Sequence, residues 1–235
     1  STYRNFEIII VENNSTEKET FDYYNKIQKE YDNVRVLTWE REFNYSAINN
    51  FGVKEAKGDY ILLLNNDTKI LDKDSLGDML GYCMRPEVGI VGSKLIYGDG
   101  TIQHAGVILG LGGIAGHAFI GLDAKEYGYM SRAYLSCDYT AVTAACLMVP
   151  KAVFDEVGGL CEEYAVAFND VDLCMKVRSK GYLVVYDAFS QWYHYESKSR
   201  GYEDTEEKQL RFKGEIDTFK SKWQKELDEG DPFYN

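Results

Sequence analysis

Polar side chains that could bind or activate a ligand follow two apolar runs in the first third of the chain. Asn65, Asn66 and Asp67 come directly after residues 60–64, and Glu12 and Asn13 come directly after residues 6–11. Apolar runs of this length, bounded by turn-forming residues, suit strands buried in a parallel sheet. Because ligands of open α/β sheets bind just beyond the carboxyl ends of such strands, these side chains are predicted to face a ligand. The alternative is that each run simply ends in a polar turn.

Further candidates for chemistry are two closely spaced carboxylates and the three histidines of the chain, namely Asp170, Asp172, His104, His117 and His194. The carboxylates open an expected helix over residues 169–180, where the helix dipole favours their ionised form, although either could serve only as a helix cap. His104 and His117 lie in a glycine-rich segment, residues 101–121, that we expect to form an irregular loop or a hairpin. His194 stands alone among the aromatic residues of 192–195, and a lone histidine is more often structural than functional.

The elements that must position these residues alternate between strands and helices in the first part of the chain. We expect strands over residues 6–11, 34–39 and 60–67, one helix between the first two strands, and another helix over residues 44–56. This order is the βαβ pattern of a parallel, doubly wound sheet. Right-handed crossovers put the strand-end turns on one edge of such a sheet, so Glu12–Asn13 and Asn65–Asp67 are predicted to line one crevice.

The rest of the chain continues the α/β pattern and ends in a charged segment. Helices are expected over residues 75–84, from residue 150 to about 158, and over 169–180; strands are expected over 89–96, 142–149 and 182–186. From about residue 203, apolar residues recur every three or four positions, which predicts one long amphipathic helix on the flank of the domain. We interpret residues 1–235 as a single domain with two halves, residues 1–100 and 101–201, and a C-terminal helix over residues 202–235.

Composition excludes some partners and suggests a compartment. Lys and Arg number 26 against 38 Asp and Glu, a formal charge of −12, which argues against binding to nucleic acid or to anionic lipid. A phosphate-bearing ligand would therefore need a local positive charge, such as a bound metal. The five cysteines are widely spaced and include no Cys-x-x-Cys pair, so we expect neither a zinc site nor disulfides and favour a reducing, cytosolic compartment. No apolar run approaches the roughly 18 residues of a membrane span.

Three segments together resemble the family-2 glycosyltransferases of bacterial cell-surface polysaccharide synthesis, which have the GT-A fold. They are residues 9–15 (Ile-Ile-Val-Glu-Asn-Asn-Ser), residues 44–67, which end in Gly-Asp-Tyr-Ile-Leu-Leu-Leu-Asn-Asn-Asp, and residues 168–174 (Phe-Asn-Asp-Val-Asp-Leu-Cys), with His194 downstream. The resemblance extends to about residue 201, and it implies that residues 1–100 are the nucleotide-binding half and residues 101–201 the acceptor and catalytic half. It implies a GT-A-type, mostly parallel sheet flanked by helices. It also implies a hexosyltransferase-like enzyme that moves a sugar, with inversion and with a divalent metal, from a UDP- or dTDP-linked donor to a carbohydrate acceptor.

The resemblance assigns roles to the nucleotide and metal side. Glu12, with Asn13 beside it, stands where the family usually has an aspartate that contacts the base. Asn65-Asn66-Asp67 occupies the position of the Asp-x-Asp metal motif, so Asp67 would bind Mg²⁺ or Mn²⁺, while Asn65 and Asn66 would contact the ribose or offer a carbonyl. His194 matches a second metal ligand. Such a metal would neutralise the charge that the departing diphosphate gains.

The resemblance also assigns the catalytic and acceptor side. Asp170 matches the catalytic base, which takes the proton of the acceptor hydroxyl as that oxygen attacks the anomeric carbon. Asp172, Trp192 and His104 are candidates for the acceptor side, because carboxylates and flat rings suit sugar hydroxyls and sugar faces; His117 is a similar possibility. Lys198 and Arg200, beyond His194, would close over the diphosphate as a cationic loop.

Two features depart from the family's pattern and keep alternatives open. An apolar strand normally precedes the strand at residues 6–11 and lies centrally in the sheet, so we expect a fragment of a longer protein, in the cytoplasm or at the inner face of the membrane, with a gap in its sheet or something else in that position. Asn65 and Asn66 replace acidic residues, which leaves a non-catalytic domain that binds nucleotide-sugar or glycan as the main alternative. A nucleotidyltransferase would need a glycine-rich, basic signature loop, which the sequence lacks.

Overall fold

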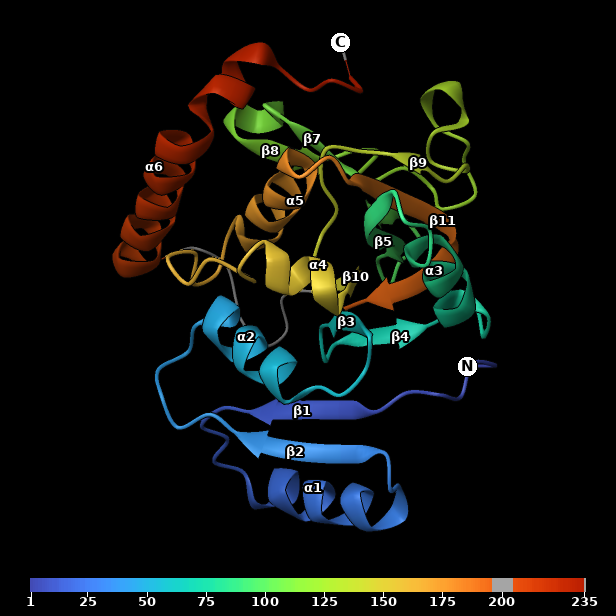
Figure 1. Cartoon of the computed structure of the whole chain (residues 1–235), viewed down its shortest axis with the longest axis vertical. Helices are drawn as coiled ribbons and strands as arrows, with labels where there is room; N and C mark the ends of the chain where they lie inside the picture. The colour runs from blue at the N-terminus through green and yellow to red at the C-terminus, as the bar shows by residue number, and fades with distance from the viewer. Residues whose placement is uncertain (196–204, 235) are drawn as a thin grey trace.

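The computed structural model describes residues 1–195 and 205–234. Its main sheet has the strand order β3-β10-β5-β11-β4, with β6 paired to β5 and β9 paired to β11. Figure 1 shows helices on both sides of this sheet and a smaller strand–helix unit at one end. The strands of the main sheet are β3 (Tyr60–Leu64), β4 (Thr68–Ile70), β5 (Val88–Ile96), β6 (Ile102–His104), β9 (Cys137–Asp138), β10 (Cys146–Pro150) and β11 (Leu183–His194).

The main sheet is mixed rather than mostly parallel. β11 runs parallel to β5, but β10 is antiparallel to both β3 and β5, and β4 is antiparallel to β11. The reason lies between β5 and β10, where the chain returns through short strands and turns instead of a helix. Parallel neighbours need a long crossover, usually helical, and antiparallel neighbours do not. The expected α/β class is confirmed, while the expected parallel setting of β3 is wrong.

A second, two-stranded sheet stands apart from the first. β1 (Ile8–Glu12) pairs in parallel with β2 (Val34–Thr38), and α1 (Lys18–Glu30) connects them. Neither strand pairs with β3, and among the described residues no strand lies between β1 and β3, so the expected gap in the sheet is confirmed (Figure 1). The gap explains why the Ile-Ile-Ile-Val run of β1 is only partly covered, with Ile8 43% exposed.

Two apolar cores cover the two faces of the main sheet. Successive side chains of a strand point to opposite faces, and in β10 Leu147 and Val149 join the core beneath α5, while Cys146 and Met148 join the core beneath α3. β5 is buried along its whole length between β10 and β11. The remaining helices are α2 (Tyr45–Glu55), α3 (Ser75–Cys83), α4 (Lys151–Glu156), α5 (Asn169–Ser179) and α6 (Glu206–Glu229).

The glycine-rich segment forms a hairpin. β7 (Val107–Leu109) pairs antiparallel with β8 (Ala115–His117) across the short 3₁₀ turn Leu111–Gly113, and a second 3₁₀ turn, Tyr129–Ser131, follows. One glycine of the main sheet has a packing role: a Cβ on Gly92 of β5 would lie 2.4 Å from Cβ of Val142. The segment that leads into β10 can therefore lie directly against the central strand. No helix in the described parts of the chain is long and apolar enough to cross a membrane.

Candidate active site

Asp67 and His194 meet because β4 and β11 are neighbours. Asp67 ends the turn between β3 and β4, and His194 is the last residue of β11, paired with Thr68. Their side chains approach to 3.1 Å between Asp67 Oδ1 and His194 Nε2, and the Asp67 backbone carbonyl accepts from the Tyr195 N–H at 2.9 Å. The two residues that the resemblance pairs as metal ligands are thus adjacent in space, although 127 positions separate them in the sequence.

The surroundings of this pair fit a cation. Gln103 Oε1 lies 2.6 Å from His194 Nδ1, and because a carbonyl oxygen only accepts, Nδ1 carries a proton. In the neutral imidazole, Nε2 then presents a lone pair to Asp67 Oδ1, which is buried and accepts no hydrogen bond in the described structure. Two electron-donating atoms that face each other favour a metal ion or a proton between them. A carboxylate and an imidazole are both ligands that divalent metal ions take, although the described residues contain no group of three or more such ligands.

The two asparagines of the motif differ in their surroundings. Asn65 is half-buried, and its Nδ2 lies 3.3 Å from His194 Nε2, while its backbone N–H donates to the carbonyl of Ala145 at 3.0 Å. Asn66 is exposed at the tip of the turn. Asn65 therefore lies beside the candidate metal ligands, whereas Asn66 is exposed, where a ligand could reach it.

Asp170 lies in the first turn of α5 with its carboxylate held from two sides. Oδ2 accepts from the backbone N–H of Ala144 at 3.1 Å, and Oδ1 accepts from the N–H of Val171 at 2.8 Å. The preceding Phe168 has φ of +61°, a left-handed conformation that a bulky residue seldom adopts, so the turn into α5 is strained. Burial, with the nearby Asp170 charge, raises the pKa of Tyr45, whose hydroxyl donates to the carbonyl of Ala144.

Residues 143–145 connect the two halves of the site. Their backbone donates to Asp170 through Ala144, donates to His104 Nε2 through Thr143 at 3.4 Å, and accepts from Asn65 through Ala145. The sequence suggested only a strand over 142–149, whereas β10 begins at Cys146 and this segment runs ahead of it. Its role is carried by main-chain atoms, which no side-chain motif reveals.

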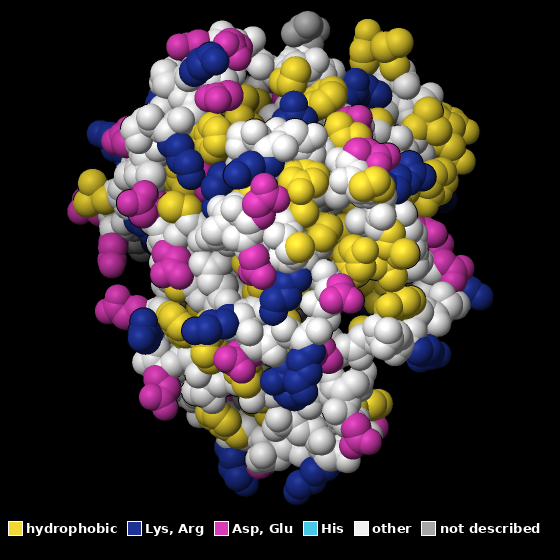
Figure 2. All heavy atoms as spheres, viewed as in Figure 1, with side chains coloured by type: hydrophobic (Ala, Val, Ile, Leu, Met, Phe, Trp, Pro, Cys, Tyr) yellow, Lys and Arg dark blue, Asp and Glu magenta, His cyan; other side chains and the backbone are white. Residues whose placement is uncertain are grey.

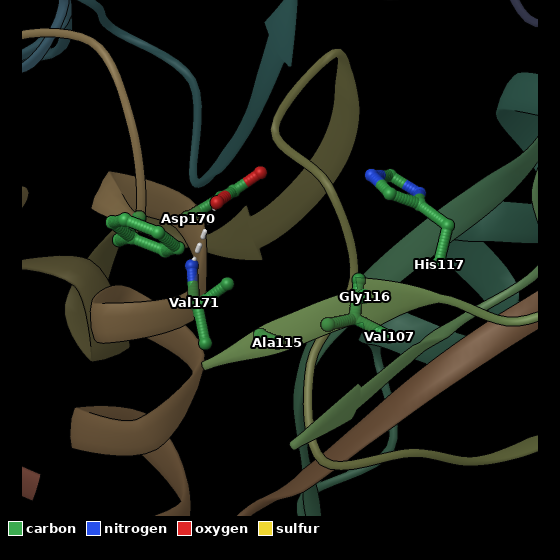
Figure 3. Close-up of a pocket in the computed structure, with 7 residues that line it drawn as sticks. Val107, Ala115, Gly116, His117, Asp170 and Val171 are labelled. Carbon is green, nitrogen blue, oxygen red and sulfur yellow. Dashed lines mark hydrogen bonds between the residues drawn. The ribbon is translucent and has the colours of Figure 1, made fainter. Parts of the chain in front are cut away.

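A pocket of about 150 Å³ opens at Asp170. One wall is the β7–β8 hairpin and the other is the start of α5; the lining residues are Val107, Ala115, Gly116, His117, Phe168, Asp170 and Val171. Figure 3 shows the His117 ring and the Asp170 carboxylate on opposite sides of this space. His104 is fully buried behind His117, with 2.9 Å between the two Nδ1 atoms, so His104 does not line the pocket and its acceptor role stays a prediction.

The other two acceptor-side candidates are core residues in this structure. Asp172 is fully buried, where it accepts from Trp223 Nε1 at 2.9 Å and pairs with Lys222 at 2.6 Å. Trp192 is buried in the core beneath α3, on the face of the sheet away from α5. Neither side chain lines the pocket, because the strand pairing of β11 turns Trp192 inward and α6 covers Asp172.

The long helix α6 does more than pack on the flank. Glu215, 3% exposed, accepts from the backbone N–H groups of Val166 and Ala167 at 2.9 and 3.2 Å, in the loop that leads to Asp170. Beyond the helix, Asp231 accepts from the Leu109 N–H of β7 at 2.7 Å. The C-terminal segment therefore holds both walls of the pocket, a function that its amphipathic pattern did not indicate.

Glu12 and Asn13 lie at the end of β1, on the separate sheet. Glu12 is buried and its Oε1 accepts from the Ser15 N–H at 2.6 Å, while Asn13 Nδ2 donates to the carbonyls of Trp39 and Arg41. Within the described residues, no hydrogen bond joins this turn to Asn65–Asp67. Both side chains stabilise the ends of β1 and β2, and the structure leaves their nucleotide role as a prediction. Lys198 and Arg200 lie outside the described residues.

The charged surface agrees with the composition. Acidic and basic side chains are interspersed over the face seen in Figure 2, and no continuous basic area appears there. Sequence-independent binding to nucleic acid requires a basic stripe, and the face shown in Figure 2 has none.

Comparisons with known proteins agree with this geometry. The family model described as "Glycosyl transferase family 2" matches residues 1–157. An uncharacterized protein, y4gI, of Sinorhizobium fredii is 48% identical over 234 residues, which cover 99% of this chain and 26% of that protein. The O-antigen biosynthesis protein RfbC of Myxococcus xanthus is 39% identical over 204 residues, which cover 84% of this chain and 16% of that protein. The chain thus spans about a quarter or less of these relatives.

Among solved structures, GalNAc-T7 in complex with UDP, GalNAc and Mn²⁺ superposes with a TM-score of 0.66 at 13% identity, covering 85% of this chain and 39% of that one. At this identity the likeness shows the fold alone, and that fold is GT-A. The match of the family model over most of the chain shows the membership: this chain belongs to glycosyltransferase family 2.

Proposed function

We propose that the domain transfers a sugar, with inversion, from a nucleoside-diphosphate donor to a hydroxyl of a carbohydrate acceptor in the synthesis of a cell-surface polysaccharide. The observation that carries the proposal is the arrangement of Asp67, His194 and Asp170 around residues 143–145, with a pocket beside Asp170. The likeness to an O-antigen biosynthesis protein supports the pathway.

Asp67 and His194 would hold a divalent cation, Mn²⁺ or Mg²⁺. Asp67 Oδ1 is buried and accepts no hydrogen bond in the described structure, and it lies 3.1 Å from His194 Nε2, which supports this assignment. Bound there, the cation would offset the negative charge of the diphosphate in a protein whose net charge is −12. The complex of GalNAc-T7 with UDP and Mn²⁺ has the same fold and supports the choice of metal.

Asp170 would act as the base. The acceptor oxygen forms its bond to the anomeric carbon of the donor, the bond from that carbon to the diphosphate breaks, and the hydroxyl proton passes to the Asp170 carboxylate. The N–H groups of Ala144 and Val171 hold this carboxylate in place. Inversion is supported because Asp170 is the one carboxylate that lines the pocket in the described structure.

The donor would be UDP- or dTDP-linked. Glu12 at the end of β1 would accept from the imide N–H of the base and Asn13 would support it, while Asn65 and Asn66 would face the ribose. For this role, Glu12 would have to give up the hydrogen bond that its Oε1 accepts from the Ser15 N–H, or use Oε2 instead. We also infer a cytoplasmic position, either away from the membrane or at its inner face as part of a larger protein; the five free cysteines support a reducing compartment.

The test is a thermal-shift titration of the domain with UDP, dTDP and GDP, each with and without Mn²⁺, followed by assays of nucleotide release from UDP-sugars. We expect stabilisation by UDP or dTDP that depends on Mn²⁺ and is lost in Asp67→Ala. The anomeric configuration of the product, measured by NMR, tests inversion. Binding of nucleotide without any turnover would favour a non-catalytic nucleotide-sugar domain, and no response to any nucleotide would reject the proposal.

A further inference from the structure

We propose that Phe168 recognises the acceptor: its ring stacks on the C–H face of the acceptor sugar, while Asp170, two residues later, takes the proton of the reacting hydroxyl. This inference rests on the proposed function and deepens it. The ligand class is one pyranose ring with an apolar face, on which no axial hydroxyl interrupts the C–H groups.

Phe168 supplies an aromatic surface beside the candidate base. It is half-buried and lines the pocket of about 150 Å³ together with Asp170. Of the described residues that line this pocket, Phe168 alone carries a benzene ring; the others are His117, Asp170 and four small or aliphatic residues. The volume equals about five waters at roughly 30 Å³ each, so the pocket admits one sugar ring rather than an oligosaccharide.

The backbone at Phe168 is strained to place a ring at this position. Its φ of +61° and ψ of 2° lie in the left-handed region, which costs a residue other than glycine about 1–3 kcal/mol. Glycine adopts this conformation without that cost, so a turn needed only to begin α5 would favour glycine. Such conformations concentrate at active sites and ligand clamps. The strain at Phe168 therefore points to a role for its ring beyond the turn itself.

Two rings of α6 fix the orientation of the Phe168 ring. Phe212 lies nearly parallel to it, with 5.6 Å between ring centroids and 25° between ring planes, and Phe219 lies at 5.6 Å and 43°. Phe212 and Phe219 are seven positions apart, so they lie on one face of α6. Phe168 stays half-buried despite these contacts, because it also borders the pocket. A ring that is already held in place loses little side-chain entropy when a ligand stacks on it.

A pyranose suits this combination of an aromatic ring and a carboxylate. It carries hydroxyls around its edge and C–H groups on its faces, and the weakly positive C–H groups are attracted to the negative face of an aromatic ring. Each Asp170 oxygen accepts one backbone N–H, from Ala144 or from Val171, and keeps a further lone pair for a sugar hydroxyl. With one face of the sugar on Phe168, an edge hydroxyl can meet Asp170 (Figure 3).

The division of labour follows from the chemistry. The oxygen that attacks the anomeric carbon gives its proton to Asp170, and the Phe168 ring neither gains nor loses a proton. Stacking fixes the position of the sugar ring without changing the electron density on the attacking oxygen. Phe168 should therefore affect acceptor binding more than the chemical step.

The first test is kinetic, with UDP-sugar donors, Mn²⁺ and a panel of methyl hexosides as acceptors. Phe168→Tyr keeps the ring and should keep the acceptor KM of wild type. Phe168→Leu keeps an apolar side chain without the ring, so it should raise the acceptor KM about three- to tenfold and leave kcat and UDP affinity nearly unchanged. Phe168→Gly removes the backbone strain together with the ring; it provides a second ringless variant and should raise the acceptor KM at least as much.

Phe212→Leu is the matched control. It removes the parallel ring of α6, while Phe219 still holds Phe168. If Phe168 had only a structural role, Phe168→Leu and Phe212→Leu would raise the acceptor KM equally for equal losses of stability. We expect the larger rise in Phe168→Leu, and equal rises would overturn the inference.

The second test needs no turnover. Saturation-transfer NMR, with the aromatic protons of the domain irradiated, shows which protons of a bound methyl hexoside lie against aromatic rings. We expect the strongest transfer to the C–H protons of one sugar face in wild type and in Phe168→Tyr, and its loss in Phe168→Leu. Equal transfer in wild type and Phe168→Leu would overturn the inference.

The outcomes separate this inference from the proposed function. If wild type transfers sugar but Phe168→Leu keeps the wild-type acceptor KM, the inference alone is overturned. If wild type transfers no sugar but shows saturation transfer that Phe168→Leu loses, the proposed function fails and the stacking role of Phe168 stands. If wild type neither transfers sugar nor binds any hexoside, both fail.

Discussion

Glu215 offers a sharp test of how the fold supports the candidate base. Its buried carboxylate accepts from the backbone N–H groups of Val166 and Ala167, just ahead of Asp170. Glu215→Ala leaves both donors without a partner, at about 1–3 kcal/mol each, or about 2–6 kcal/mol together. Val166 and Ala167 are only half-buried, so water can replace some of the lost hydrogen bonding. We therefore expect Glu215→Ala to lower the free energy of unfolding by about 2–3 kcal/mol.

The assay is chemical denaturation of Glu215→Ala, Glu215→Gln and a control, Asp217→Asn, which removes one negative charge from an exposed position of the same helix. Glu215→Gln keeps one acceptor oxygen, so it should lose about half as much stability as Glu215→Ala. Turnover should fall with stability, while Mn²⁺-dependent UDP binding stays, because Asp67 lies on a different element. Equal stability of all three variants, within about 0.5 kcal/mol, would show that Glu215 does not stabilise the loop ahead of Asp170.

Three further predictions concern the supports of the site. Gln103→Leu removes the acceptor that orients the candidate metal-binding imidazole and should weaken Mn²⁺ binding about 10–100-fold by titration calorimetry; unchanged affinity would contradict this. Gly92→Ala puts a Cβ against Val142 and should lower the free energy of unfolding by about 1–3 kcal/mol. Gly77 of α3 has open space around it, so Gly77→Ala should raise the free energy of unfolding by about 0.5–1 kcal/mol. Similar effects of the two substitutions would show that Gly92 is not needed for close packing against Val142. The pKa of His104 is lowered in the folded state, so its contribution to stability is full above the unfolded pKa of about 6.5. As the pH falls from there toward the folded pKa, stability should fall by up to about 1.4 kcal/mol per pH unit. His104→Gln should remove this slope in denaturation experiments between pH 5 and 7, and a slope equal to that of wild type would contradict the prediction.

The sequence predicted the turn that ends in Asp67 because local signals define it: an apolar run followed by polar residues. It missed the extension of β11 from residue 187 to His194, because a shift of register between Asp187 and Gln191 breaks the alternation that marks a strand. The role of residues 143–145 lies in main-chain hydrogen bonds, which leave no pattern in side-chain types. The gap between β1 and β3 was predicted from the family resemblance, whereas the antiparallel pairing of β10 depends on contacts between distant segments.

Charged residues were the hardest to interpret. Glu215 and Asp172 lie in helices with many other charges, where a solvated position is the usual outcome, yet both are buried. Their partners, backbone N–H groups of a loop for Glu215 and the Trp223 indole for Asp172, are at least 48 positions away. Only the packing of α6 against α5 brings these groups together, so no spacing rule within one element could reveal them.

The central claim is that Asp170 is the base of a sugar transfer, and Asp170→Asn tests it most directly. The measurement is the rate of UDP release from a panel of UDP-sugars, with Mn²⁺ and methyl hexoside acceptors, for wild type and Asp170→Asn, with UDP affinity measured in parallel. We expect a fall of about 10²–10⁴-fold in the rate, with UDP affinity unchanged because the candidate metal ligands lie on other elements. A variant that keeps a near-normal rate would contradict it.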